Sequence, residues 1–536
     1  MGASTSSEKA PVEKQEVEAL ASSTGSLLML QSSFSKLSVR NTQIIPFASL
    51  QKCFHLTLKN SISEAPMMPE HFRVLVDQLG VSIVDLFFGA EKGGFSWVEF
   101  LKGYVKCCGR KPASMSLKNL LRVYATSASK AGLPSNLHIE FVEDDCKITG
   151  LLLPAELHML LLMSWVMLGS SRILASSSIK TGRTLPVMDH LILSAVSWCT
   201  EVASNFDAWE CNISGMEINL SAEKIQTWAF NTVPCLADCL ARFVHAGLQY
   251  CTTLEEGLDP SSLSVGDNSS RKSCDTHLLT CGRAWAVSLT TGSTEEIIRV
   301  SFPSNGDGID DNILYRSSLH GKGLNRLWSK IEGYHGSILM LISARSVNSS
   351  DGSNDRKWII GALTQQSFEN QDTFYGSSGN LYAFSPVFHA ISPSGKEKNF
   401  VYSHLRPSSR TYESHPKPVG IAFGGSIGNE RIFLGEDFDK LTIRHHAVDK
   451  TYGPGSLVPN QGFLPLEGLV SEVEVWGLGG RKAKEVQSGY KQREQLFMEQ
   501  RRKVDLKTFS SWEDSPEKMM MDMISDPNHA RSEVRK

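Results

Sequence analysis

The chain is 536 residues long, with 41% hydrophobic residues, 21% charged residues and a formal net charge of -3. This length predicts two or three domains, because single cores seldom grow beyond about 250–300 residues. The near-neutral charge gives no electrostatic reason to expect nucleic acid as a partner. No apolar run is long enough to span a bilayer, and the N-terminus lacks the apolar stretch of a secretory signal. We therefore expect a cytoplasmic or peripheral membrane protein.

All eleven cysteines lie between Cys53 and Cys281, without a regular framework. In a reducing compartment this distribution indicates buried thiols, not disulfides. Neither the Cys107-Cys108 pair nor the Cys235 and Cys239 pair has the usual spacing of zinc ligands, and no matching second pair follows. We predict no metal site and no cofactor.

Residues 1–38 are expected to form a disordered tail that begins MGASTSS. Gly2 follows the initiator Met, and Ser6 occupies the position where the N-myristoylation pattern requires Ser or Thr. A Ser-rich tail without a lipid is the alternative. One myristoyl chain binds membranes only marginally, so stable residence would need a second signal elsewhere.

Residues 39–251 are expected to be helical, and the segment Phe87–Tyr104 resembles a calcium-binding EF-hand loop with its flanking helices. With Glu99 as the twelfth loop position, Gly93 falls at the sixth and Phe95 at the eighth, as the sharp turn and the apolar pin require. The first, third and fifth positions carry no carboxylate, so this loop should not hold calcium.

A second EF-hand candidate runs from Asp145 to Glu156, but Lys147 at its third position would repel the cation. At best it is a weak calcium site made by Asp145 and Glu156. We therefore predict an all-α, EF-hand-like scaffold, followed by a linker over residues 252–277, where Ser, Gly, Asp and Pro predominate.

Residues 278–480 change to short apolar segments separated by Gly, Asn, Ser and Pro. This rhythm predicts two packed antiparallel sheets with helices at their edges, in a multidomain α+β chain. The expected strands are Ser337–Ala344, Trp358–Leu363, Asn380–Phe384, Phe400–His404, Val419–Gly424, Arg431–Gly435, Leu441–His445 and Leu469–Gly477.

The same region contains YRSSLHGKGLNRLWSKIEGYHGS, VGIAFGGSIGNERIFLGEDF and LVSEVEVWGLG, in that order. It resembles the TLDc domain, the module of the oxidation-resistance proteins. The landmarks are His320, Gly321, Trp328, His335, Gly336, Gly424, Gly425, Glu474 and Trp476. The resemblance implies a β-sandwich with flanking helices. The whole architecture is similar to TLDc proteins of the mTOR-associated and yeast telomere-capping-restriction type, which pair a myristoylation motif with an EF-hand-like region.

One motif suggests a hydrolase, since residues 424–428 read GxSxG and Asp and His residues follow. The nucleophile elbow requires a helix after the serine, whereas another strand is expected here, so we predict a hairpin. His320, His335 and Glu474 could in principle perform acid–base chemistry. We favour a role in maintaining the fold, and predict no catalytic residues and no enzyme activity.

Residues 481–536 are expected to form a basic helix and tail, and Arg481–Lys507 carries nine basic and four acidic residues. This segment is either a solvated helix, the second membrane signal, or a docking element for an acidic groove.

The resemblance implies a non-enzymatic adaptor whose TLDc domain binds the cytosolic sector of the vacuolar-type proton ATPase. Such an adaptor would reside on vacuolar, lysosomal or other endomembranes and affect acidification, TOR-type nutrient signalling or stress signalling. The alternatives are an oxidative-stress protection factor with unrecognised chemistry and a calcium-responsive sensor that acts through Asp145–Glu156.

Overall fold

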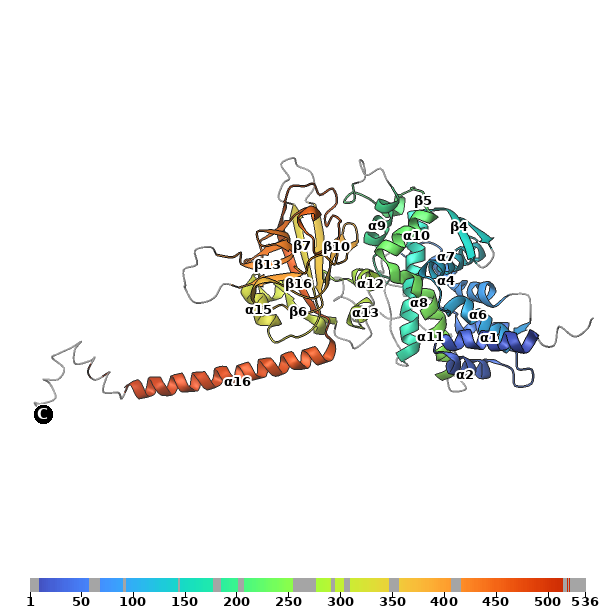
Figure 1. The fold of residues 1–536 in the computed structure, drawn as a ribbon, viewed down its shortest axis with the longest axis horizontal. Coiled ribbons are helices and arrows are strands. Elements are labelled where there is room, and N and C mark those ends of the chain that lie inside the picture. The colour runs from blue at the N-terminus through green and yellow to red at the C-terminus, as the bar shows by residue number, and fades with distance from the viewer. Residues whose placement is uncertain are drawn as a thin grey trace, which may run out of the picture.

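The computed structural model describes residues 9–56, 68–89, 93–142, 145–176, 185–200, 207–253, 276–290, 295–302, 309–346, 356–405, 416–513, 518 and 520. A helical body formed by residues up to 253 lies beside a body built around a large sheet, with helices α12 (Cys281–Thr290) and α13 (Glu295–Ser301) between them (Figure 1). Gly2 and most of the predicted linker lie outside the described residues.

The helical body contains eleven α-helices within the described residues. They are α1 (Lys9–Ser23), α2 (Leu27–Leu37), α3 (Phe47–Cys53), α4 (Phe72–Asp77), α5 (Leu79–Ile83), α6 (Trp97–Cys108), α7 (Ala113–Lys130), α8 (Pro154–Ser176), α9 (Asp189–Cys199), α10 (Ala222–Thr232) and α11 (Cys239–Thr253). Two of them lie within residues 1–38, so the predicted disordered tail is wrong from Lys9 to Leu37, because Val17, Ala21 and Leu30 are buried in the core. Shorter turns are the π-helical η1 (Val84–Phe88) and the 3-10 helices η2 (Ile213–Gly215) and η3 (Pro234–Asp238). α10 and α11 are separate because Pro234 removes a backbone donor and interrupts the ladder.

The loop predicted around Gly93 leads into a short strand, β2 (Gly94–Phe95), and then into α6. A capping box between Ser96 and Glu99 starts α6, since the Ser96 backbone N–H donates to Glu99 at 3.0 Å. β2 pairs antiparallel with β1 (Ile45–Pro46), which lies between α2 and α3. Glu99 therefore caps the start of α6 together with Ser96. The strand that pairs with this loop is β1, which precedes the loop in the chain.

The second predicted loop is wrong, because Asp145–Leu152 forms strand β4. It pairs along seven positions with β3 (Asn136–Val142) and at its end with β5 (Leu220–Ser221). Cys146 and Ile148 are buried while Lys147 between them is exposed, the period of two that defines a half-buried strand. The helical body is therefore not all-α.

In the part of the second body that the structure describes, all eight predicted strands are present, with three more. They are β6 (Ile313–Arg316), β7 (Ile338–Ser346), β8 (Lys357–Thr364), β9 (Gln371–Tyr375), β10 (Gly379–Ser385), β11 (His389–Ile391), β12 (Val401–His404), β13 (Gly420–Ser426), β14 (Asn429–Gly435), β15 (Lys440–Ile443) and β16 (Leu466–Gly477). Its other elements are α14 (Ser317–His320), α15 (Leu324–Ile331), α16 (Gly480–Glu513) and the 3-10 helices η6 (Ile309–Asn312) and η7 (His446–Val448).

The strands form one curled antiparallel sheet, not the two separate sheets that the sequence suggested. The order is β11-β10-β8-β7-β16-β15-β14-β13-β12-β9, and β6 also pairs with β16. β16 is twelve residues long, so it pairs with β7 along most of its length, with β15 near its start and with β6 near its end. This strand makes the hydrogen-bonded path continuous.

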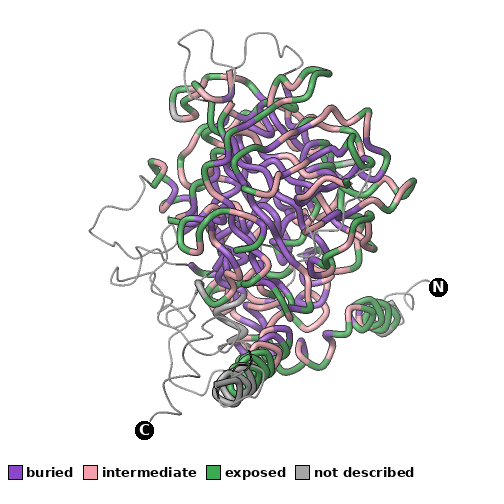
Figure 2. Tube along the Cα trace, turned by 90° about the vertical axis from the view of Figure 1, so that its left-hand side faces the viewer, coloured by how far each residue is buried: buried purple, intermediate pink, exposed green. Residues whose placement is uncertain are grey.

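Both faces of the central strands are buried. In β7, Ile338, Met340 and Ile342 pack into the core enclosed by the curl, whereas Leu339 and Leu341 face a second core. That second core is shared with α12 and the helical body. Figure 2 shows the buried residues gathered throughout the interior. The two bodies are therefore joined by a continuous apolar core.

Polar contacts reinforce this junction. The Phe388 backbone N–H donates to the His190 carbonyl at 2.9 Å, and the Trp209 indole donates to the Lys357 carbonyl at 3.0 Å. Arg356 lies 4.8 Å from the centroid of the Trp209 ring and forms an ion pair with Asp207 at 2.8 Å.

Among the described helices, none has both the length and the apolar character needed to cross a membrane.

Candidate functional site

Glu474 lies at the centre of a buried polar cluster on the outer face of β16. Its Oε2 accepts a hydrogen bond from the Trp476 indole at 3.1 Å and one from the Leu279 backbone N–H at 3.3 Å. His277 Nδ1 and Arg316 Nε each lie 3.6 Å from Oε1. The His277 ring also stands edge-on to Trp476, with the ring centroids 5.6 Å apart. Two predicted landmarks, Glu474 and Trp476, therefore contact each other.

The cluster keeps Glu474 ionised in the interior. Burial alone would raise the pKa of this carboxyl group, but the His277 side chain, the Leu278 backbone and the Trp476 indole hold the pKa below its ordinary value. The carboxylate thereby holds His277 and Leu279, which directly precede α12, against the sheet. This contact anchors α12 between the two bodies. The side chain of Glu474 has no exposed surface.

The second landmark set, Gly424 and Gly425, surrounds a buried ion pair. Arg431 Nη1 lies 3.2 Å from Asp449 Oδ2, and both side chains are almost completely buried. Asp449 Oδ1 accepts from the Gly425 N–H at 2.9 Å. Gly424 has φ +68°, and a Cβ atom there would lie 2.6 Å from Asp449 Oδ2. Glycine is required because the hairpin approaches this carboxylate closely.

The β13–β14 hairpin also shows whether the GxSxG sequence at residues 424–428 forms a hydrolase site. β13 and β14 form a hairpin in which Ser426 faces Asn429, and Ser426 is exposed at its tip. A strand follows the serine where a nucleophile elbow has a helix. Asp439, one of the candidate acids, lies 4.0 Å from Lys322 on the surface. The predicted hairpin is confirmed, and this motif does not form the elbow of an α/β-hydrolase.

The histidine landmarks do not converge on one site. His320 Nδ1 accepts the backbone N–H of Arg316 at 3.0 Å and so holds the turn of α14, with Gly321 directly after it. His335 is exposed beyond the end of α15. Gly336 permits the chain to pass Gly479, since a Cβ atom there would lie 2.8 Å from the Gly479 Cα. His320 and Gly336 therefore support the fold, as the sequence suggested, whereas the side chain of His335 is exposed.

Trp328 of α15 is partly buried against the core enclosed by the sheet. α16 begins beside this helix: Gln487 donates to the carbonyls of Lys330 and Glu332 at 2.8 and 3.3 Å, and Tyr490 donates to Glu332 at 2.9 Å. Beyond this contact α16 projects from the sheet body (Figure 1). The predicted basic segment is a helix, as expected.

The exposed part of α16 combines positive charge with apolar side chains. Leu496, Phe497 and Met498 are each more than half exposed, and the basic residues Arg493, Arg501, Arg502 and Lys503 are also exposed. An α-helix rises about 1.5 Å per residue, so Arg501 to Lys503 lie about 15–18 Å along α16 beyond Lys491, which still contacts the Lys330 carbonyl.

The calcium candidate separates into unrelated elements. Asp145 begins strand β4, whereas Glu156 lies in the first turn of α8, where its Oε2 accepts the Leu153 N–H at 2.7 Å. Across the residues that the structure describes, no group of three or more His, Cys, Asp or Glu side chains is arranged to hold a metal ion.

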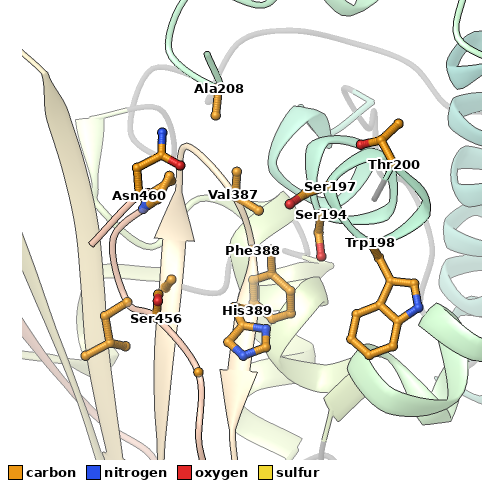
Figure 3. Close-up of a pocket in the computed structure, with 14 residues that line it drawn as sticks. Ser194, Ser197, Trp198, Thr200, Ala208, Val387, Phe388, His389, Ser456 and Asn460 are labelled. Carbon is orange, nitrogen blue, oxygen red and sulfur yellow. The ribbon is translucent and has the colours of Figure 1, made fainter. Parts of the chain in front are cut away.

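A pocket of about 340 Å³ lies between α9 and the sheet body. Figure 3 shows Ser194 and Trp198 on the helical side, facing Phe388, His389 and Asn460. Burial, with a smaller contribution from Arg431, lowers the pKa of His389, so the imidazole is neutral at pH 7. The described residues that line the pocket carry no formal charge, so it suits neutral groups.

Comparison with known protein families identifies the domain formed by the sheet body. The TLDc domain model matches residues 287–479, which span the sheet from β6 to β16 together with the end of α12. The chain is therefore a TLDc domain-containing protein, and the resemblance found in its landmarks is confirmed. No curated protein matches the chain.

Sequence reasoning missed four residues of the two buried clusters, namely His277, Arg316, Arg431 and Asp449. His277 stood at the end of a predicted linker, and Arg316 and Arg431 resemble ordinary surface charges in sequence. A single sequence carries no signal for such partners, because the chain brings together positions as far apart as His277 and Glu474.

Proposed function

We propose that this protein is a non-enzymatic peripheral adaptor whose TLDc domain binds and regulates the vacuolar-type proton ATPase on an endomembrane. The observation that carries the proposal is the TLDc domain match over residues 287–479. The landmarks of that domain other than His335 lie at packing and close-approach positions, which supports a role in the fold over a role in catalysis. The effect on acidification, and on TOR-type or stress signalling, would follow from the state of the pump that the adaptor prefers.

The protruding part of α16 supports a separate role for this helix, as a second contact with the pump or the membrane. α16 projects from the sheet body (Figure 1), and its exposed cations can contact an acidic groove of the pump or an anionic lipid surface. Each basic residue near such a surface contributes about 1 kcal/mol. Myristoylation at Gly2 would add a marginal membrane anchor, and α16 would supply the second signal.

The test is co-sedimentation of the full chain with vacuolar membranes, with ATP hydrolysis and release of the pump's cytosolic sector measured together. Saturable binding that changes hydrolysis or release supports the proposal and gives the sign of regulation. A folded chain that shows no binding at micromolar concentration would refute it.

Two variants with the same charge change separate the role of α16 from general electrostatics. Arg501, Arg502 and Lys503 changed together to Glu should weaken binding. The matched control changes Lys52, Lys106 and Arg110 to Glu on the helical body, where all three are exposed. Equal weakening by both variants would assign the effect to net charge and not to α16.

Protection against oxidative damage is a second candidate, because the TLDc domain is the module of oxidation-resistance proteins and residues 287–479 match it. The proposed chemistry near His320, His335 and Glu474 can be tested by survival of oxidant-treated cells. Loss of protection in a folded His335→Ala variant would favour chemistry at this exposed residue, whereas retained protection would favour the adaptor.

A further inference from the structure

The sulfur atoms of Cys53 and Cys251 lie 2.9 Å apart, although 198 positions separate them in the chain. Cys53 ends α3, and Cys251 lies in the last turn of α11. Their contact is held by the core, since Phe54, next to Cys53, is fully buried and packs on Phe243 of α11, with the ring centroids 6.3 Å apart. The two thiols are therefore positioned by the fold.

A disulfide bond is about 2.05 Å long, so the two sulfur atoms need to approach by only about 0.9 Å to bond. The other close cysteines differ from this pair. Cys107 and Cys108 are adjacent in sequence, and Cys239 Sγ contacts the Cys235 carbonyl at 3.9 Å and not its sulfur. Cys53 and Cys251 instead bring two sulfur atoms into contact from separate helices.

The two thiols share a hydrogen bond, in which Cys251 Sγ donates to Cys53 Sγ, and a cation lies beside them. Lys36 donates to the carbonyl of Thr252, which places its charge next to Cys251. Because the two sulfur atoms are in contact, they titrate as one pair, and the ammonium favours the form in which the pair carries a thiolate. Thiolates are the nucleophiles of cysteine chemistry.

We propose that Cys53 and Cys251 form a redox modification site that a peroxide converts into a reversible disulfide between α3 and α11. The thiolate of one cysteine of the pair attacks one peroxide oxygen, the O–O bond breaks, and the departing hydroxide leaves as water after taking a proton. The other thiol then attacks the resulting sulfenic acid and releases the second water. Two thiols and one hydrogen peroxide give one disulfide and two waters, and a dithiol reductant restores the thiols.

The bond would close a chain loop that includes α4 to α10. It would also fix the last turn of α11, after which the chain continues toward residue 276 and the TLDc domain. This inference is independent of the pump proposal, because it concerns the helical body alone. It predicts that oxidation rigidifies the helical body without changing the TLDc fold.

The experiment uses the reduced, folded full chain and stoichiometric hydrogen peroxide. Remaining thiols are blocked, the protein is digested without reductant, and cross-linked peptides are quantified by mass spectrometry. The expected result is a predominant Cys53–Cys251 peptide that dithiothreitol removes, with a melting temperature about 5 °C or more above that of the reduced protein.

Two serine variants complete the design. Cys251→Ser should abolish both the cross-link and the melting shift, whereas Cys108→Ser should retain both. The proposal is overturned if peroxide leaves Cys53 and Cys251 of the wild-type chain blocked as free thiols, oxidises them on separate peptides, or joins them mainly to other cysteines. This readout comes from the wild-type protein and does not depend on the folding of any variant.

Discussion

Arg431 and Asp449 form an ion pair at 3.2 Å in the interior of the TLDc domain, where neither side chain is more than 1% exposed. Arg431 also donates to the carbonyls of Gly453 and Gly455 at 2.8 and 2.7 Å, and Asp449 accepts the N–H of Thr451 at 2.8 Å. One pair thus holds the long segment between β15 and β16 against the β13–β14 hairpin. The polar contacts concentrate on two side chains, so the loss of one leaves the other charged and buried.

Replacing Asp449 with Ala should destabilise the protein by about 3–5 kcal/mol, because the Arg431 guanidinium would lose its counter-charge in the interior. Urea unfolding followed by tryptophan fluorescence measures this change. The control is Glu295→Gln, which breaks the exposed Arg299–Glu295 pair of α13 at 2.8 Å and should cost less than about 0.5 kcal/mol. Similar costs for the two variants would contradict the structural role of the buried pair.

Alanine substitutions at two glycines of the β13–β14 hairpin, Gly424 and Gly428, can distinguish the cost of backbone strain from the cost of a steric clash. Gly424 and Gly428 both have positive φ, +68° and +83°, so alanine at either position costs about 1–2 kcal/mol of backbone strain. Only at Gly424 would the added Cβ displace Asp449, since it has no neighbour within 4 Å at Gly428. Gly424→Ala should therefore lower the melting temperature clearly more than Gly428→Ala. Equal shifts would show that the carboxylate moves aside without cost.

His190 makes the junction between the two bodies sensitive to acid. Burial, with a smaller contribution from Arg283, lowers the pKa of His190 to about 3, against about 6.5 in the unfolded chain. The unfolded state therefore binds the extra proton between these values, so this contribution to stability is complete above pH 6.5 and lost as the pH falls. At pH 5 the loss is about 2 kcal/mol.

A His190→Gln variant lacks this titration, so its stability should fall less than that of the wild type between pH 7.5 and pH 5. Urea unfolding at both pH values measures the difference. His389→Gln shows whether a second buried histidine adds to the acid sensitivity, because burial also lowers the pKa of His389, which follows Phe388, the residue whose N–H donates to the His190 carbonyl. A wild type and a His190→Gln variant with parallel pH profiles would show that His190 does not set the acid sensitivity.

Eight of the TLDc strands could be predicted because each has a period of two or a continuous apolar run bounded by turn residues, whereas β6, β9 and β11 were not predicted. In β16, Val473 and Val475 face the inner core while Glu474 and Trp476 face outward, as the alternation indicated. The connection of the strands into one sheet could not be predicted. It depends on β16 pairing with β7 and also with β6 and β15, and those long-range pairings leave no local signature.

The second EF-hand candidate is a case in which a local sequence pattern predicted a loop that the structure does not contain. Asp145, Gly150 and Glu156 matched the loop template, but Gly150 has φ +106° and allows close approach to Asn136 within the β3–β4 hairpin. A few residues in register were outweighed by the strand alternation of Cys146 and Ile148. At the candidate sites, the landmarks could be located from sequence. Their partners His277, Arg316, Arg431 and Asp449 could not, because the pairings exist only in the folded chain.

The attachment of α16 can be tested with one residue at its base. Gln487, 8% exposed, donates to the carbonyls of Lys330 and Glu332 at the end of α15, and Gln487→Ala would leave both without this donor. The local cost should be about 1–2 kcal/mol, which corresponds to about a tenfold faster amide exchange in residues 480–491. Gln492→Ala makes the same change at an exposed position of the same helix and should leave exchange unchanged. If the two variants exchange alike, Gln487 does not fix α16 on the domain, and the direction in which its cations project is not set by this contact.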